Sequence, residues 1–205
     1  MPDPRAQPVP PSPEHHGEDG TASTELPTGL PAPPDDGAAD HLPQLPLPAL
    51  ELPATDGRTV RLDQLGPGRW VLYLYPMTRR PDQGEDPEWN AIPGARGCTP
   101  QACAFRDHHQ ELLAAGAEGV YGLSSQDVEY QREVVERLHL PFPLLSDPDL
   151  RLARQLRLPT FEARGQRLFR RLTLLVRDGR IEHVWYPVFP PDQHPRQVVD
   201  WLGVG

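Results

Sequence analysis

Apolar residues come in short runs along most of the chain, and the spacing within each run predicts a strand or a helix. Residues 70–75 form a continuous apolar and aromatic run that stops at Pro76, which is typical of a central strand buried on both faces. A similar run over residues 119–124 predicts a second buried strand. Residues 127–138 carry apolar positions at helical spacing, so we expect a helix directly after that strand.

The remaining patterned segments are shorter. Asp178-Gly179 lies between two runs rich in β-forming residues, 168–176 and 181–186, and this arrangement is a strong signal of a β-hairpin. The other predicted elements are strands at residues 60–62 and 142–145 and helices at residues 149–156 and 194–202. Alternating strands and helices followed by a hairpin and a last helix are typical of a thioredoxin-like α/β fold, with a central mixed sheet flanked by helices.

A long polar segment separates the first buried strand from the next predicted helix. Residues 78–96 contain several prolines and glycines, so we expect a loop, and loops of this length in compact domains tend to be functional. Thr99 offers an N-cap oxygen and Pro100 suits the first helical position, which predicts a helix over residues 99–115. Cys98 then lies at the N-terminal end of that helix.

The start of the chain has a different composition. The first 46 residues hold 12 of the 28 prolines and no aromatic residue, so they lack the apolar surface that offsets the entropy of ordering. We therefore expect a disordered, Pro-rich acidic tail at residues 1–44 and a single domain at residues 45–205.

The charge distribution excludes several function classes. The net charge is −9, and −7 of it lies in the first 46 residues. The rest of the chain is therefore nearly neutral and offers no basic field for nucleic acid or an anionic membrane. All 20 basic residues are Arg, and the lack of Lys excludes P-loop nucleotide sites and Schiff-base enzymes.

The chain contains no apolar run of signal-peptide length near Met1 and none near the ~18–20 residues of a membrane span. We expect a cytoplasmic protein. Cytoplasmic thiols are kept reduced, so its two cysteines fit catalysis or metal binding better than a structural disulfide.

Cys98 and Cys103 are the centre of the predicted chemistry. The thiolate is the nucleophilic form of cysteine, and a helix N-terminus favours it, so Cys98 is placed to be the reactive thiol. In an ideal helix two residues five apart have Cα atoms roughly 8–9 Å apart, beyond the ~7 Å at which a disulfide requires backbone movement. A disulfide between these two residues therefore requires the first turns of the helix to unwind.

Two other interpretations of the cysteines remain. In the simplest one, Cys103 is a small buried residue and Cys98 is a loop thiol without a chemical role. In the other, His108 and His109 complete a zinc site, but positions five apart on a helix do not share a face and neighbouring histidines diverge. The histidines His108 and His109 are therefore interpreted as solvated, and no metal is expected.

The segment around the cysteines resembles a known active site. Residues 97–107 read Gly-Cys-Thr-Pro-Gln-Ala-Cys-Ala-Phe-Arg-Asp, which is similar to the active-site helix of peroxiredoxins of the bacterioferritin-comigratory, or Q, type. The segments 71–76, 144–147 and 171–179 also resemble that family's strand before the active-site Pro, its Leu-Leu-Ser-Asp segment, and its Arg-bearing strand and hairpin. The resemblance covers about residues 45–205.

The resemblance implies a thiol peroxidase without a cofactor, which reduces hydrogen peroxide or organic hydroperoxides. Cys98 is then the peroxidatic nucleophile, Cys103 the resolving thiol, and Arg171 the group that stabilises the thiolate and orients the peroxide. Its neighbour Arg170 is the alternative, which the spacing to the apolar run disfavours. The implied partners are peroxide and thioredoxin or a similar dithiol reductant, and we expect a monomer or a weak homodimer.

The chain departs from the family pattern in one respect. That pattern has Pro seven residues and Thr or Ser three residues before the nucleophile, where this chain has Ala91 and Ala95. Pro76 and Thr78 lie where the family's strand ends, so residues 79–96 resemble an insertion inside the motif. The hydroxyl donor is therefore missing from its usual position.

We expect Thr78 to fold back toward Cys98 and supply the hydroxyl. The alternatives are partial substitution by Pro93 and Thr99, or weaker activation of the peroxide. Trp89, within the insertion, is either a lid or a contact for a partner, or it anchors the loop.

Two further functions compete with the peroxidase. A redox sensor uses the same disulfide switch to alter a partner protein, without efficient peroxide turnover, and the missing hydroxyl suits it. A disulfide oxidoreductase acting on proteins is disfavoured because the chain lacks a Cys-x-x-Cys motif.

Overall fold

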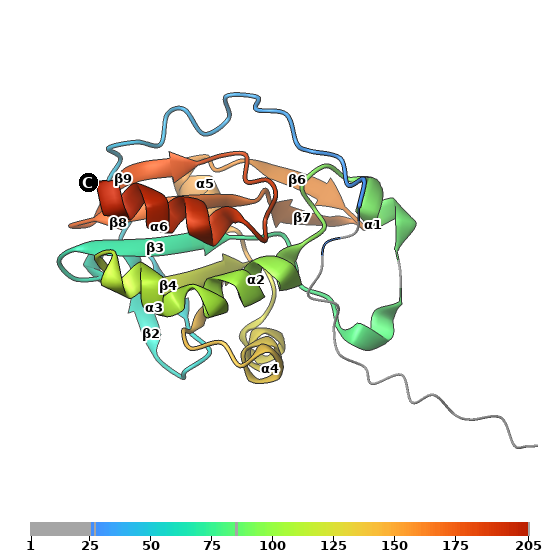
Figure 1. Ribbon diagram of the computed structural model, residues 1–205, viewed down its shortest axis with the longest axis horizontal. Helices are drawn as coiled ribbons and strands as arrows, with labels where there is room; N and C mark the ends of the chain where they lie inside the picture. Colours follow the sequence, from blue (N-terminus) through green and yellow to red (C-terminus); the bar gives the residue numbers. More distant parts are fainter. Residues whose placement is uncertain (1–25, 27, 85, 205) are drawn as a thin grey trace, which may run out of the picture.

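The computed structural model describes residues 26, 28–84 and 86–204. Five strands form a mixed central sheet in the order β5-β4-β3-β8-β9 (Figure 1). They are β3 (Arg69–Leu74), β4 (Ala117–Ser124), β5 (Leu144–Ser146), β8 (Leu172–Arg177) and β9 (Arg180–Trp185). The strands β3, β4 and β5 run parallel, while β8 is antiparallel to β3 and β9 to β8. The predicted thioredoxin-like α/β architecture is confirmed.

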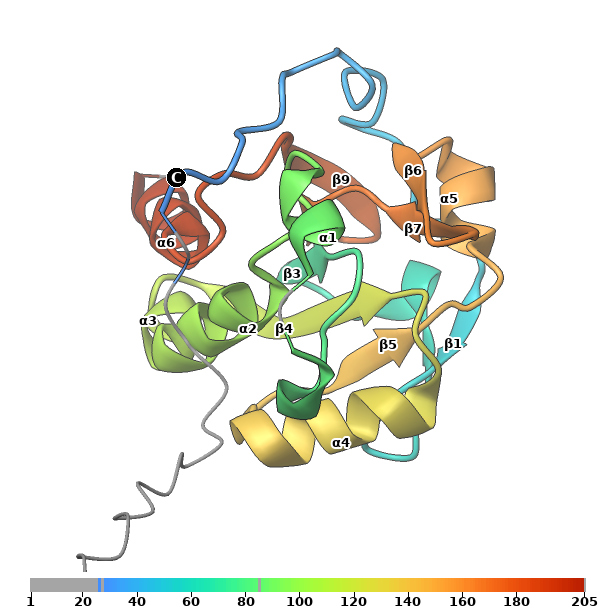
Figure 2. The same ribbon diagram turned by 90° about the vertical axis from the view of Figure 1, so that its right-hand side faces the viewer.

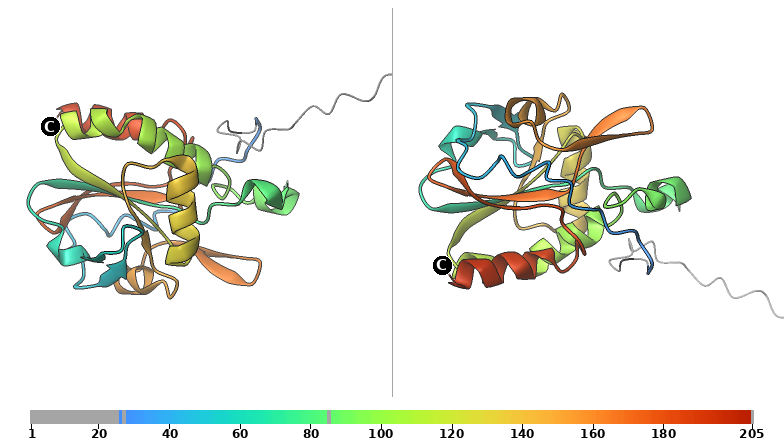
Figure 3. Two further views of the ribbon diagram at one scale, coloured as in Figure 1. Left: turned by 90° about the horizontal axis from the view of Figure 1, so that it is seen from below. Right: turned by 90° about the horizontal axis from the view of Figure 1, so that it is seen from above.

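Each face of the sheet is covered by its own set of elements (Figures 1 and 3). One face packs against four helices: α2 (Cys98–Asp107), α3 (His109–Ala114), α4 (Val128–Leu138) and α6 (His194–Val204). The other packs against α5 (Arg151–Leu156), the β1–β2 hairpin (Glu51–Pro53 and Thr59–Arg61) and the short 3-10 helix η1 (Leu62–Gln64). The sheet therefore separates two apolar cores.

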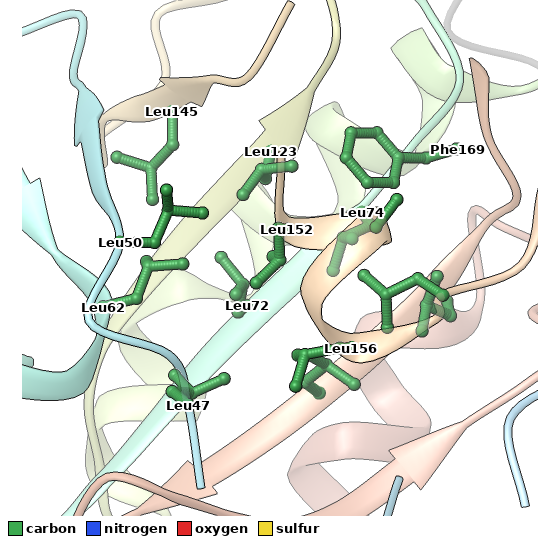
Figure 4. Packing of buried hydrophobic residues seen from close by; sticks show 14 of the residues in the cluster. Leu47, Leu50, Leu62, Leu72, Leu74, Leu123, Leu145, Leu152, Leu156 and Phe169 are labelled. Atoms are coloured by element: carbon green, nitrogen blue, oxygen red, sulfur yellow. The ribbon is translucent and has the colours of Figure 1, made fainter. Parts of the chain in front are cut away.

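Alternation along β3 distributes its side chains between the two cores. Tyr73 and the following Tyr75 face the helices α2, α4 and α6. Leu72 and Leu74 face a core made almost entirely of leucine and other aliphatic side chains (Figure 4). A strand buried on both faces explains why its sequence is continuously apolar.

The part of the chain before residue 45 is not all tail. Leu42 is fully buried in the leucine-rich core, and His41 Nε2 lies 2.8 Å from the Leu156 carbonyl oxygen. The backbone N–H groups of Gln44 and Leu47 donate to the carbonyls of Ile181 and Gly179 at the edge of β9. The packed domain thus begins before residue 45, and the prediction of a tail is wrong for the residues just before it (Figure 2). Residues 1–25 and 27 of that predicted tail lie outside the described part of the chain.

Residues 78–96 contain helical turns, so the prediction of an irregular loop is wrong in part. They include a 3-10 helix, η2 (Pro81–Gln83), and a short helix, α1 (Pro87–Ala91), capped by the Asp86 side chain, which accepts from the Trp89 backbone N–H. The Trp89 side chain is buried, and its ring lies 6.1 Å from that of Phe161. Trp89 is therefore an anchor of this segment.

The partner of α1 is a hairpin absent from our predictions, formed by β6 (Thr160–Ala163) and β7 (Gln166–Phe169). The predicted strand over residues 168–176 is consequently split between β7 and β8, which are separated by Arg170 and Arg171. The turn between these strands is Arg164-Gly165, where both residues have positive φ, of 55° and 71°. A glycine adopts such values without strain, so Gly165 is the sequence signal for this turn.

The helix expected at residues 99–115 begins one residue earlier and is divided in two. Gly97 occupies the N-cap position with φ of 104°, and Cys98 is the first helical residue, so Thr99 is not the cap. His108 separates α2 from α3. Among the helices that the structure describes, none has the length and apolar character to cross a membrane.

Candidate active site

Arg171 and Cys98, which are distant in the sequence, meet at the start of α2. Arg171 lies in the short connection between β7 and β8 and is 3% exposed, and Cys98 is 5% exposed. The Arg171 Nη2 atom donates to Cys98 Sγ at 3.1 Å. Arg170, the alternative candidate, lies over the ring of Phe161, 5.8 Å from its centroid. A guanidinium hydrogen-bonded to the sulfur is positioned to stabilise the thiolate form.

The same guanidinium holds the segment that leads into Cys98. Arg171 donates to the backbone carbonyls of Gly94, Ala95 and Arg96 at 3.2 to 3.3 Å. Its Nη1 atom also donates to the Gln101 side-chain oxygen. Arg suits this position because its planar fork serves several acceptors at once.

Gln101 is a site residue absent from our predictions. It lies one helical turn after Cys98 and is fully buried. Its position three residues after Cys98 places both side chains on one face of α2, and a buried amide on that face requires a polar partner. That partner, Arg171, comes from far along the chain, so its contact was not visible in the sequence.

Cys103 lies in a different environment on the same helix. Both cysteines are free, and Cys103 is 4% exposed. Burial raises the pKa of the Cys103 thiol, and the nearby Arg106 opposes this effect only in part. Cys98 and Cys103 both belong to the continuous helix α2, so the expectation that α2 unwinds before a disulfide forms remains a prediction.

Thr78 does not supply the hydroxyl that we expected from it in this structure. It is buried, but its hydroxyl donates to Gln126 Oε1 at 3.1 Å, and its backbone N–H donates to the same oxygen at 2.8 Å. Its carbonyl accepts from Gln126 Nε2 and from the Tyr130 hydroxyl. Gln126, in the loop after β4, and Tyr130 of α4 thus hold Thr78 in place. The single proton of the Thr78 hydroxyl is already donated to Gln126 and is not free to be donated at Cys98.

Pro76 is buried just after the end of β3, where the resemblance placed it. At the position three residues before the nucleophile, Ala95 contributes its backbone oxygen, which accepts from the Cys98 thiol at 3.6 Å. Within the described residues, the hydrogen bonds of the Cys98 sulfur are those with Arg171 and Ala95. The side-chain hydroxyl of the family pattern therefore has no counterpart at Cys98.

His108 and His109, the histidines considered for a zinc site, have other neighbours. The described ranges contain no group of three or more His, Cys, Asp or Glu side chains arranged to hold a metal ion. His108 Nδ1 lies 3.1 Å from Glu111 Oε1, and the His109 ring packs 5.6 Å from that of Phe142. His109 is half-buried, so it is less solvated than expected.

His194, at the start of α6, is a further buried polar group near the site. Its Nε2 atom lies 2.8 Å from Thr173 Oγ1, and its Nδ1 atom lies 3.1 Å from Gln197 Oε1. Burial, with a smaller contribution from the Arg171 charge, lowers the pKa of His194 to about 4. His194 is therefore neutral at pH 7 and packs edge-on against Phe105 of α2.

The sequence profile of the redoxin family matches residues 42–200, which is most of the chain. The chain belongs to the redoxin family. Peroxiredoxin Bcp of Escherichia coli (strain K12) is 32% identical to this redoxin over 164 residues, covering 76% of this chain and 91% of the relative. The chloroplastic peroxiredoxin Q of Triticum aestivum is 31% identical over 147 residues, and the match spans 60% of that relative's length.

Solved structures agree with this assignment. Peroxidoxin BcpB from Mycobacterium tuberculosis is 27% identical with a TM-score of 0.63, covering 80% of this redoxin and 98% of that chain. Peroxiredoxin Q of Xanthomonas campestris is 26% identical with a TM-score of 0.60, covering 78% and 96%. This redoxin is thus a peroxiredoxin of the Q/Bcp type, as the motif around Cys98 indicated.

Proposed function

We propose that this redoxin is a thiol peroxidase that reduces hydrogen peroxide or organic hydroperoxides. The observation that carries the proposal is the hydrogen bond from Arg171 to Cys98 Sγ at the start of α2, with a second free thiol, Cys103, on the same helix. A buried cation at a cysteine on a helix N-terminus is the environment of a reactive thiolate.

In the first step the Cys98 thiolate attacks one oxygen of the hydroperoxide. The S–O bond forms as the O–O bond breaks, and the other oxygen takes up a proton and leaves as water or an alcohol. Cys98 is oxidised to a sulfenic acid. Arg171 stabilises the negative charge that moves from sulfur to the leaving oxygen, because it remains charged throughout.

In the second step the Cys103 sulfur attacks the Cys98 sulfenic acid. The S–S bond forms, the S–O bond breaks, and the hydroxyl leaves as water with the proton of the Cys103 thiol. A dithiol reductant such as thioredoxin then restores both thiols by exchange. We further propose that this cycle operates in the cytoplasm, where such reductants keep thiols reduced.

A redox sensor is the second candidate, and a specific observation favours it. Ala95 replaces the hydroxyl of the family pattern, and the Thr78 hydroxyl already donates to Gln126. Activation of peroxide then depends on Arg171 and on the first N–H groups of α2, which have no acceptor within the helix. Without that hydroxyl we expect slower oxidation of Cys98, and a redox sensor does not require fast turnover.

Stopped-flow measurement of peroxide consumption with thioredoxin and its reductase tests the proposal. The wild-type protein should turn over. Cys98→Ser should abolish the reaction, and Cys103→Ser should be oxidised at Cys98 at the wild-type rate and then stop without forming an intramolecular disulfide. Oxidation of wild-type Cys98 no faster than that of free cysteine would rule out the peroxidase and leave the sensor.

A further inference from the structure

A buried hydroxyl without a partner lies beneath α2. Tyr73, near the end of β3, is fully buried in the core that contains both cysteines, and its ring stacks on that of Phe105 with centroids 4.3 Å apart. The Tyr73 hydroxyl oxygen is inaccessible and has no hydrogen-bond partner among the described residues. A Cβ at Gly122 of β4 would lie 2.6 Å from this oxygen, so the neighbouring strand closes tightly around it.

Tyr75 provides the natural comparison. Its ring lies 5.7 Å from that of Tyr73 on the same face of the sheet, and it is also buried. The Tyr75 hydroxyl, however, donates to Gln131 Oε1 at 2.9 Å. The two phenols therefore differ in whether their hydroxyl is paired.

An unpaired buried hydroxyl destabilises the state that buries it, because it has given up its hydrogen bonds to water. A second such group lies on α2 itself, where the Gln101 side-chain Nε2 is buried without a partner among the described residues. The packing of α2 on β3 thus contains two polar groups that gain hydrogen bonds when water reaches them.

Unwinding of α2 would give water that access. Phe105, which covers Tyr73, and Cys103 both belong to α2, and α2 ends at His108, where a separate helix begins. The first ten helical residues can therefore rearrange without breaking α3. Reaction of Cys103 with Cys98 requires this same rearrangement, since the two residues are five positions apart on one helix.

We propose that Tyr73 is a positioning residue for the second chemical step: its unpaired hydroxyl destabilises helical α2 and favours the unwound form in which Cys103 reaches Cys98. The proposal rests on the proposed function, because that step is the attack of Cys103 on the Cys98 sulfenic acid, with release of water. Tyr73 does not contact the reacting sulfur atoms; it changes how often the unwound form brings them together.

The variant Tyr73→Phe keeps the ring stacking and removes only the hydroxyl. Rapid-quench mass spectrometry after a pulse of peroxide should show Cys98 sulfenic acid forming at the wild-type rate. Disulfide formation should slow by about fivefold or more, the factor expected when one unpaired hydroxyl is removed. At high peroxide the longer-lived sulfenic acid should be oxidised more often to sulfinic acid.

Hydrogen exchange of the reduced protein tests the same idea without peroxide. In Tyr73→Phe, the amides of α2 should exchange about fivefold or more slowly, while those of α4 should be unchanged. If wild-type Cys98 fails to react with peroxide, the proposed function fails, but this measurement still decides the role of Tyr73. Unchanged exchange in α2 would overturn the proposal.

Tyr75→Phe is the matched control. It removes a paired hydroxyl, so it should lower the stability of the fold and leave disulfide formation no slower than in the wild type. Equal slowing in Tyr73→Phe and Tyr75→Phe would show that any lost phenol has this effect, and would overturn the proposal. An unchanged rate of disulfide formation in Tyr73→Phe would overturn it as well.

Discussion

The two faces of the central sheet are built from different side chains. The face covered by α5 and the β1–β2 hairpin is mainly leucine and other aliphatic residues, among them Leu72 and Leu74, with a few aromatic rings such as Phe169 (Figure 4). The face covered by α2, α3, α4 and α6 holds both cysteines, stacked aromatic rings and buried polar groups such as His194. One sheet therefore supports a mainly aliphatic core on one side and a chemically reactive layer on the other.

This difference shows how a small domain can combine stability with a local rearrangement. The mainly aliphatic core has few polar atoms that gain hydrogen bonds from exposure to water, and the Trp70 ring nitrogen at its border is one of them. The opposite layer contains polar groups that gain hydrogen bonds on opening, and its central helix is already divided at His108. We expect global stability to depend mainly on the first face and the redox chemistry on the second.

The largest effect should come from the leucine-rich face. Leu74→Ala removes a fully buried side chain and should lower the free energy of unfolding by about 2–5 kcal/mol. Urea denaturation measures this, with the half-buried Leu65→Ala as the control that should cost less. The rate of Cys98 oxidation should not change under folding conditions; a parallel loss of that rate would show that the two faces are not independent.

The next largest effect should come from His194, on the face that carries the cysteines, and it should appear as a pH dependence of stability. Burial lowers the pKa of this imidazole to about 4. The contribution of neutral His194 to the free energy of unfolding is therefore fully present above the unfolded pKa of about 6.5, and it is lost as the pH falls toward 4. The loss should approach about 3 kcal/mol. Urea denaturation across this range measures it, and His194→Gln should flatten the dependence. An unchanged slope in that variant would assign the acid sensitivity to other groups.

Arg171→Lys changes the reactive face at its centre, next to the Cys98 sulfur. An ammonium group cannot serve the Cys98 sulfur and three backbone carbonyls at once, so the second-order rate constant for peroxide should fall by about 10²-fold. Stopped-flow kinetics measures this. Arg170→Lys is the control, because Arg170 lies over Phe161 and away from the sulfur. An unchanged rate in Arg171→Lys would mean that positive charge alone is sufficient, and equal losses in both variants would mean that the contact with the Cys98 sulfur is not what matters.

The smallest effect should come from Thr78→Val. The Thr78 hydroxyl pairs with Gln126, so its removal should cost about 1 kcal/mol of stability and leave the oxidation rate of Cys98 unchanged. The same denaturation and stopped-flow measurements apply. A large fall in the rate would show that the hydroxyl turns toward the peroxide during the reaction, as the sequence first suggested.

Patterns within one segment of sequence predicted much of the structure. The central strand, the strand after it, the hairpin at Asp178-Gly179 and the position of Cys98 at a helix start all depend on neighbouring residues. The motif around Cys98 and Cys103 also indicated the family. These features are local, and local patterns record them directly.

What was missed depends on contacts between distant segments. Thr78 is held by Gln126 and Gln101 by Arg171, and neither pairing leaves a mark in the sequence near either member. Residues 168–176 were predicted as one strand because β-forming residues lie on both sides of Arg170 and Arg171, although β7 and β8 belong to different sheets. Composition places Leu42 in the tail because the segment around it is rich in proline, and composition does not show that one leucine in such a segment is buried.

The backbone contacts of residues 44–47 have a consequence for how the molecule meets others of its kind. An outer strand presents unpaired N–H and C=O groups that can recruit a strand from another chain, with aggregation as the result. Gln44, Leu45 and Leu47 already occupy such groups at Gly179 and Ile181, where β9 begins. Residues 44–47 thus cover the start of the edge strand β9 and protect it from pairing with a strand of another chain.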